Sequence, residues 1–281
     1  MIKRLLFVAA GLIALSVMNA CSGKATSGNS LGHDSTLCQF SNINKQRMMQ
    51  YATLDGDTCY INNEFSAFWP ELINGKACPA LQAALLQVLT DSSELNTLDL
   101  AMEYLLKPNQ YLEFDSTTLK TVQTIKDDDN NLSTSDVNVT LESMTDRLMT
   151  YHIRTYGYLA GGAHGIYSNR YVTYDLLTEK AVPLSDLIAD TTLLRNTILK
   201  SIKQEYEYDK DDLFIPDNGL LPLPGDFFIE GSVLHAVYQV YDIASYAQGA
   251  IVAPIYPYML KPEEMKRLFT PYGLELIDYN E

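Results

Sequence analysis

Basic residues are scarce in this sequence. Its 281 residues hold 20 Lys and Arg against 35 Asp and Glu, which gives a formal charge of −15. Only Lys3 and Arg4 are charged among the first twenty residues, and without those two cations the charge falls from −15 to −17. Proteins that bind nucleic acid need clustered cations to neutralise phosphates. We therefore expect no nucleic-acid partner.

Motifs that mark known chemistry are also missing. The four His residues have no helix-face ligand spacing, and there is no His-Glu-x-x-His or Cys/His finger pattern. The chain lacks a P-loop and a dinucleotide-binding glycine pattern. Its Gly-x-Ser-x-Gly match, Gly28 to Gly32, lies in the Ser- and Gly-rich stretch before residue 36 and not between a predicted strand and helix, where serine hydrolases carry that turn. We therefore predict no metal site, no cofactor and no catalytic residue, although a pair of carboxylates could act without leaving a motif.

Long apolar runs are absent except near the N-terminus, where residues 5–17 carry no charge. This run follows a short basic start and is shorter than the roughly 20 residues of a membrane span, which is typical of a secretory signal. It ends in Met18-Asn19-Ala20-Cys21, which resembles a bacterial lipobox. We predict a lipoprotein signal peptide at 1–20 and acylation of Cys21, palmitate included. The alternative is an ordinary cleaved signal with a chance Cys.

Residues 21–36 are rich in Ser, Gly and Thr and are expected to form a flexible tether. Acyl chains on Cys21 would hold the protein on a membrane without crossing it, since each buried methylene contributes about 0.8 kcal/mol. Ser22 directly after the lipidated Cys favours sorting to the outer membrane. We therefore expect a lipid-anchored protein of the cell envelope, on the outer membrane and facing the periplasm.

Three cysteines follow the tether, namely Cys38, Cys59 and Cys78. An odd number leaves room for one internal disulfide in an oxidising compartment. Residues 39–52 and 58–68 are predicted to form a β-hairpin. In its tightest register Cys38 lies opposite a position only six residues before Cys78, whereas Cys59 lies at the far end. We predict a Cys38–Cys78 disulfide with Cys59 free; the alternative is three unpaired thiols.

The remaining pattern indicates an α+β protein. Apolar residues have helical spacing after Pro79 and Thr97 and over 191–206, whereas alternation of apolar and polar residues predicts long strands between 136 and 175. Strands and helices come in separate runs, which favours a largely antiparallel sheet with a few packed helices. Further expected elements are strand-rich residues 111–126, a loop at 207–225, single strands near 226–241 and 249–256, and a helix from Pro262.

These elements divide the chain into an N-terminal α+β segment, 37–150, and a C-terminal domain, 151–281. Whether the two form one compact unit stays open. Within the second part, Gly161-Gly162-Ala163-His164-Gly165 interrupts the strands and is called the glycine loop. Adjacent glycines allow a sharp turn or the close approach of a ligand. His164 can exchange hydrogen bonds or change its charge near neutral pH.

Tyrosines surround the glycine loop, and Tyr is favoured at recognition surfaces because its ring is apolar and its hydroxyl is polar. The alternative is a structural turn with rings that merely cover a sheet. We take the loop and its aromatic neighbours as a candidate binding surface. Its residues are Gly161, Gly162, His164, Tyr156, Tyr158, Tyr167 and Tyr246.

The same region resembles a known family. Tyr158-Leu159-Ala160-Gly161-Gly162-Ala163-His164 is similar to the Tyr-x-x-Gly-Gly-Ala-His signature of RsiV-like extracytoplasmic domains. Leu184-Ser185-Asp186-Leu187 and Tyr241-Asp242-Ile243-Ala244-Ser245-Tyr246 resemble later segments of that family, and 37–150 fits its PdaC-type companion segment loosely. The resemblance implies an α+β domain of uncharacterised general function. Such domains accompany peptidoglycan deacetylases and form the outer part of an anti-sigma factor that binds lysozyme.

Because no deacetylase domain and no spanning helix are recognised in this sequence, the resemblance leaves binding as the expected function. The expected ligand is a lysozyme-like protein or a cell-wall glycan. The rival interpretation is an envelope hydrolase with an acid/base pair near the glycine loop, for which Asp175, Asp186 and His164 are candidates. A third interpretation is a structural subunit of a larger envelope complex.

Overall fold

The computed structural model describes residues 37–109, 112–125 and 131–277. The signal peptide, the acylation of Cys21 and the tether all fall in residues 1–36, outside the described residues, and stay predictions. Within the described part of the chain, no helix combines the length and the apolar character needed to cross a bilayer. All described residues belong to a single unit, so the two sequence segments can be treated together.

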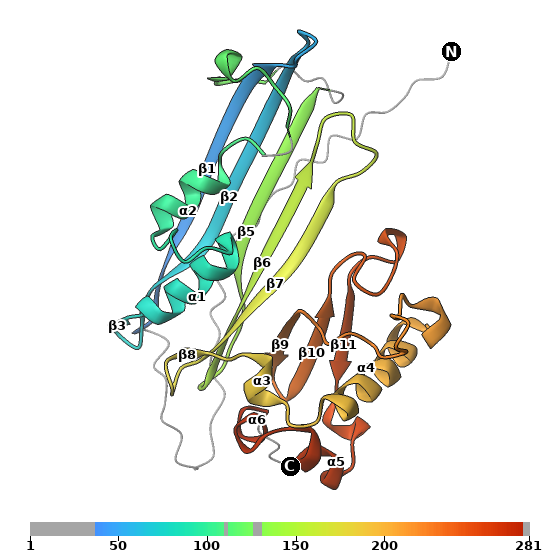
Figure 1. The fold of residues 1–281 in the computed structure, drawn as a ribbon. Helices are drawn as coiled ribbons and strands as arrows, with labels where there is room; N and C mark the ends of the chain where they lie inside the picture. Colours follow the sequence, from blue (N-terminus) through green and yellow to red (C-terminus); the bar gives the residue numbers. More distant parts are fainter. Residues whose placement is uncertain (1–36, 110–111, 126–130, 278–281) are drawn as a thin grey trace, which may run out of the picture. The chain divides into compact units, whose positions relative to one another are not determined.

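Most strands join one 8-stranded sheet in the order β4-β1-β2-β5-β6-β7-β8, with β3 paired to β2 (Figure 1). Its long strands are β1 (Gln39–Ala52), β2 (Thr58–Ile73), β5 (Leu132–Met144), β6 (Leu148–Tyr158) and β7 (Ile166–Asp175). The short strands are β3 (Lys76–Ala77), β4 (Lys120–Thr121) and β8 (Lys180–Ala181). Only the pairing of β2 with β5 is parallel. The sheet is therefore largely antiparallel, as predicted.

Two helices cover one face of this large sheet (Figure 1). Helix α1 (Pro79–Thr90) begins with Pro, whose fixed φ suits a first helical turn. Helix α2 (Leu98–Leu105) follows Thr97, whose side chain accepts the N–H of Leu100. Both helices lie where the sequence spacing predicts them. Their apolar sides pack against the inward side chains of the central strands, among them Phe65, Val137, Tyr151 and Val172.

The C-terminal part of the chain forms a second, 3-stranded sheet in the order β11-β10-β9, together with several helices. Its strands are β9 (Asp226–Glu230), β10 (Val233–Tyr238) and β11 (Ile251–Ile255). Its helices are α3 (Leu184–Leu187), α4 (Thr191–Tyr206), α5 (Pro262–Leu268) and α6 (Pro271–Leu276). These elements enclose a second apolar core. Four short 3-10 helices complete the described elements: η2 (Ser116–Thr118), η3 (Lys210–Asp212), η4 (Tyr246–Gln248) and η5 (Pro257–Met259).

Two expectations about secondary structure are wrong. The stretch near 226–241 is a hairpin of two strands, because Gly231 turns the chain with a φ of 57°. Among the described residues of 111–126, regular structure is limited to η2 and β4, because the side chain of Asp115 accepts the N–H of Thr117 and turns the chain. The boundary proposed after residue 150 lies inside β6, which pairs with strands from both sequence segments.

The large and small sheets meet through a stack of four rings. The centroids of His152 and Tyr171, both in the large sheet, lie 4.6 Å apart. Tyr171 stacks on Phe228 of β9 at 4.4 Å, and Phe228 stacks on His235 of β10 at 4.3 Å. Stacked aromatic rings stabilise a junction beyond the contribution of the apolar area that they bury. The junction lies on β7 and β6, on the face of the large sheet that points away from α1. Among the described residues, the small sheet does not extend over β1, β2 or β5 on that face.

The N-terminal hairpin has the predicted register from Phe40 to Ala52, which pairs with Thr58. The register then shifts, so that Gln39 and not Cys38 pairs with Leu72. Cys38 and Cys78 consequently pack into the same apolar cluster. Both are thiols in the structure, as is Cys59. Burial, as the main cause, raises the pKa of the Cys78 thiol, which slows its reaction as a thiolate. The disulfide is not formed here, and it stays a prediction about the oxidised protein.

The pairing of Cys38 with Cys78 can be tested by counting thiols. We expect the air-oxidised chain carrying Cys21→Ser to expose one reactive thiol, that of Cys59, when it is unfolded without reductant. Reduction before unfolding should restore all three described thiols. Adding Cys38→Ser should give the same count with and without reductant. Three thiols in the unreduced, unfolded chain would contradict the pairing.

Candidate binding site

The side of the large sheet that faces away from α1 and α2, here called the open face, is polar where the small sheet leaves it uncovered. Side chains alternate between the two faces along each strand, and most of the buried apolar ones in β2, β5 and β6, such as Phe65, Val137 and Ile153, lie on the helix side. Pairing between strands aligns the polar ones in rows across the sheet. The first polar row consists of Gln46, Glu64, Asp136, Tyr156 and Tyr167. The second polar row consists of Asn44, Ser66, Asn138, Arg154 and Asn169.

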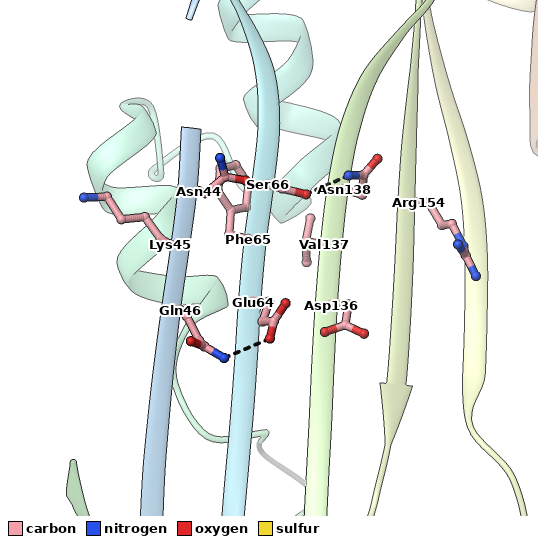
Figure 2. A pocket seen from close by; sticks show the side chains of 10 residues that line it. All are labelled: Asn44, Lys45, Gln46, Glu64, Phe65, Ser66, Asp136, Val137, Asn138 and Arg154. Carbon is pink, nitrogen blue, oxygen red and sulfur yellow. Dashed lines mark hydrogen bonds between the residues drawn. The ribbon is translucent and has the colours of Figure 1, made fainter. Parts of the chain in front are cut away.

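A cavity of about 450 Å³ is lined by members of both rows. Figure 2 shows Gln46, Glu64 and Asp136 next to one another on three neighbouring strands, with Arg154 on the far side of Asp136. Glu64 accepts hydrogen bonds from the amide nitrogens of Gln46 and Asn62, each at 2.9 Å. The cavity is therefore lined by amides and carboxylates that can donate or accept hydrogen bonds.

The side chain of Asp136 makes no hydrogen bond to another described residue. Burial and then the neighbouring Glu64 carboxylate raise the pKa of Asp136, and Arg154 of the second polar row works in the opposite direction. The two carboxylates thus differ, because Glu64 is held by amide donors and Asp136 keeps its acceptor capacity. A ligand that brings a hydroxyl or N–H group to Asp136 would satisfy a half-buried acceptor.

The first polar row ends in a group of rings, here called the tyrosine cluster: Tyr156, Tyr167, Tyr241, Tyr246 and His164. Tyr246 lies at its centre. His164 stacks on Tyr246 with centroids 4.0 Å apart, Tyr167 meets it edge-on at 6.2 Å, and Tyr241 is tilted toward it at 5.8 Å. The Tyr246 hydroxyl donates to the carbonyl of Gly165 at 2.7 Å. This bond holds the loop after β10 against the glycine loop.

Glycine is favoured at three points of the glycine loop, and one of them is Gly162, whose Cβ would lie 2.9 Å from the backbone carbonyl oxygen of Leu159. A Cβ on Gly165 would lie 2.4 Å from the ring of Tyr156. Gly161 has a φ of 78° in a turn that the N–H of Gly162 closes. The hydroxyl of Tyr158 donates to the carbonyl of Gly162 at 3.1 Å and secures the tip. The two adjacent glycines therefore shape the loop, as the structural-turn alternative expects.

The structure brings together four residues of the surface inferred from the sequence: Tyr156, Tyr167, His164 and Tyr246. Gly161, Gly162 and Tyr158 lie at the loop tip instead. Sequence patterns did not reveal the two polar rows. Their trace in the sequence is polar residues at alternating positions of 42–46, 62–66 and 134–138, but this alternation is also typical of any solvated strand face.

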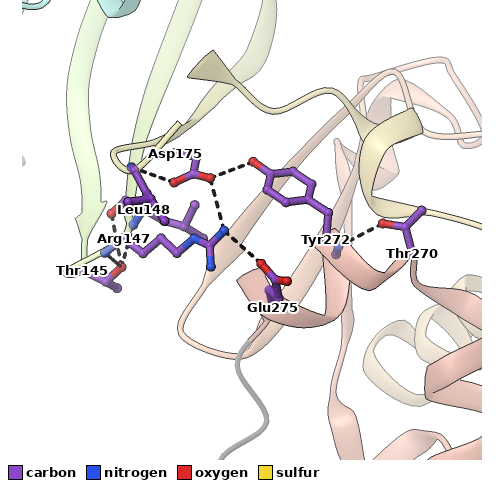
Figure 3. A network of polar contacts seen from close by, with 9 residues as sticks. Thr145, Arg147, Leu148, Asp175, Thr270, Tyr272 and Glu275 are labelled. Carbon is purple, nitrogen blue, oxygen red and sulfur yellow. Dashed lines mark hydrogen bonds and ion pairs between the residues drawn. The ribbon is translucent and has the colours of Figure 1, made fainter. Parts of the chain in front are cut away.

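Asp175, one of the candidate acids for hydrolysis, has a structural role. Its side chain is 0% exposed and lies at the end of β7 away from the glycine loop. It accepts the N–H of Leu177 and the hydroxyl of Tyr272, both at 2.9 Å, and pairs with Arg147 at 3.5 Å (Figure 3). Burial alone would raise its pKa, but these donors hold the pKa of Asp175 below its ordinary value.

The other two candidates for an acid/base pair lie elsewhere. Asp186 is exposed on α3, where it accepts a hydrogen bond from Ser185. His164 stacks on Tyr246, and its Nδ1 lies 2.9 Å from the carbonyl oxygen of Gly165. The three candidates do not meet, because the strand that carries Asp175 separates it from the loop by its full length. They therefore form no common site.

The chain matches no family model and no curated protein. Several solved structures are similar to it, including two from the DUF3298 family. A DUF3298 family member from Bacteroides fragilis has a TM-score of 0.52 and 14% identity, over 83% of this chain and 94% of that chain. A DUF3298 family protein from Pseudomonas aeruginosa has a TM-score of 0.51 and 16% identity, over 83% of this chain and 95% of that chain. At these identities the likeness shows a shared α+β fold and nothing about activity.

The role of Asp175 can be tested through the pH dependence of stability. Asp175→Asn should lower the free energy of unfolding at pH 7 by about 1.5–3 kcal/mol, the usual contribution of hydrogen bonds to a charged group. Because the folded pKa is depressed, this contribution is present above the unfolded pKa and is lost as pH falls through the folded one. Urea unfolding at neutral and acid pH should show the difference shrinking on acidification. An equal difference at both would contradict the assignment.

The packing of the glycine loop can be tested with two alanine variants. Gly165→Ala should lower the free energy of unfolding by about 1–3 kcal/mol, because its Cβ collides with the ring of Tyr156. Gly157→Ala is the matched control, since nothing lies within 4 Å of its Cβ position. Thermal unfolding should separate the two variants. Removing the ring with Tyr156→Ala should reduce the cost of Gly165→Ala, and equal stability of the two alanine variants would exclude this packing.

Proposed function

We propose that this chain is a lipid-anchored binding module of the bacterial cell envelope, whose open face holds a cell-wall glycan. The observation that carries the proposal is the alignment of the two polar rows across five strands. Their side chains are mostly amides, carboxylates and tyrosines, with Arg154 as the single cation among the row members. The cavity lined by members of both rows gives a ligand a place on this face.

Sugars fit this chemistry. Each hydroxyl of a glycan both donates and accepts hydrogen bonds, and amides and carboxylates supply the matching groups in a fixed plane. The paired amides of Gln46 and Asn62 orient Glu64, and Asp136 keeps a free acceptor. Sugar rings also present C–H faces that pack on aromatic rings, and the tyrosine cluster offers such rings at the end of the first polar row.

The proposed location depends on the sequence before residue 37. An acylated Cys21 and a tether of about fifteen residues would keep the module near a membrane while its open face samples the wall. The resemblance to RsiV-like and PdaC-type domains supports a ligand of the envelope. The resemblance is compatible with the fold shared with the two DUF3298 proteins, but that fold by itself indicates no ligand.

A second candidate is a cationic protein such as lysozyme. The observation that favours it is the charge of −15, which would speed the association of a cationic partner at low salt. The separate positions of Asp175, Asp186 and His164 give the hydrolase interpretation no support. We keep the glycan as the proposed ligand. The polar rows mark one particular face of the protein, whereas the net charge belongs to the whole chain and indicates no site.

Retention on wall polymer tests the proposal. We expect the full chain to sediment with insoluble peptidoglycan, and the double variant Gln46→Ala/Asn138→Ala to bind about tenfold more weakly, since it loses two hydrogen-bonding side chains of the cavity. Asn196→Ala, an exposed amide on α4, is the matched control and should bind normally. Both variants should unfold at the temperature of the parent chain.

The same experiment separates the two candidates. Lysozyme coupled to beads should capture the chain only if the charge-driven interaction exists, and added salt should then abolish it. Capture by lysozyme together with no sedimentation on peptidoglycan would refute the glycan proposal. Equal sedimentation of the double variant and the parent would place any glycan site away from the cavity.

A further inference from the structure

Tyr241 has an unusual backbone for an aromatic residue. Its φ is 71°, in the left-handed region that bulky side chains rarely adopt. It is the third residue of a turn that the N–H of Asp242 closes on the carbonyl of Gln239 at 3.1 Å. Gly or Asn is favoured at this position of such a turn. A large ring therefore stands where the local backbone favours a small or amide residue.

Packing does not account for this ring. Tyr241 is 53% exposed, so it contributes little to the apolar core. Its described ring contact is with Tyr246, at a centroid distance of 5.8 Å. A strained backbone conformation whose cost is not offset by packing of its own side chain is typical of ligand-binding positions. The exposed ring of Tyr241 is thus the outermost member of the tyrosine cluster.

The first polar row connects to this ring through Tyr246. It crosses five neighbouring strands, which at about 4.8 Å per strand makes a line of roughly 19 Å. Tyr167 ends the row on β7, and the ring of Tyr246 follows at 6.2 Å. Tyr241 comes next. The line changes in character along its length, from the amide and carboxylates of Gln46, Glu64 and Asp136 to aromatic rings.

We propose that Tyr241 is the aromatic anchor at one end of a linear site along the first polar row, and that this site takes an extended, unbranched polysaccharide. This inference rests on the proposed glycan function and adds its direction and length. The chain of sugars lies across the strands. Its hydroxyl and amide groups bond to the carboxylate end, and a ring at the other end stacks on Tyr241. A single sugar or a disaccharide can occupy only part of the line.

Calorimetric titration with N-acetylglucosamine oligosaccharides tests the inference on the full chain. Affinity should rise at least tenfold from the disaccharide to the hexasaccharide. Tyr241→Asn should weaken hexasaccharide binding about tenfold, and it should not lower the unfolding temperature, because Asn suits the left-handed backbone. Tyr241→Phe should keep the affinity, since the ring stays. Tyr258→Ala, which removes another exposed ring, is the matched control and should bind like the parent.

The outcomes distinguish this inference from the function on which it rests. If the chain still sediments with peptidoglycan but binds the disaccharide and hexasaccharide equally, or binds neither, the linear site is wrong and the glycan function stands. An unchanged hexasaccharide affinity in Tyr241→Asn would likewise overturn the role of Tyr241 alone. Failure to bind both the oligosaccharides and peptidoglycan would overturn the inference and the proposed function together.

Discussion

The parallel pairing of β2 with β5 is the contact on which the rest of this structure depends. Parallel neighbours cannot be joined by a tight turn, so the chain must cross over between them. Here the crossover carries α1 and α2, and both pack on the same side of the sheet (Figure 1). One face is buried as a result and the other remains open. The pairing also sets Glu64 beside Asp136, which creates the centre of the first polar row.

The small sheet, which comes from the C-terminal part of the chain, completes the proposed site. It docks on β7 through the four-ring stack, and the amide of Gln239 bonds to both the N–H and the carbonyl of Asn169, as a neighbouring strand would. This docking brings Tyr246 to Gly165, 81 positions earlier in the sequence. The tyrosine cluster is therefore composite, since neither sheet provides its rings alone.

The open face is suited to many weak contacts. Its hydrogen-bonding groups face water before a ligand arrives, so each bond contributes about 1 kcal/mol once water is displaced. Such a surface gains affinity through the length of its ligand and through tethering, which raises the effective concentration near an immobile polymer. An acidic, cation-poor surface also repels other polyanions, and for this reason we expect no nucleic-acid partner.

Local sequence patterns, such as apolar spacing, helix caps and short turns, determined much of the fold. Helix α4 follows from its apolar spacing and from Asp190, whose side chain accepts the N–H of Leu193, and the first hairpin follows from its short turn. The sequence alone also pointed to the glycine loop and its tyrosines. Only the tertiary structure decided that Gln46, Glu64 and Asp136 share a row and that Tyr241 lies beside Tyr246. The reason is physical: caps and periodicity act between near neighbours, whereas register between distant strands is decided by packing and hydrogen bonds that leave no local signal.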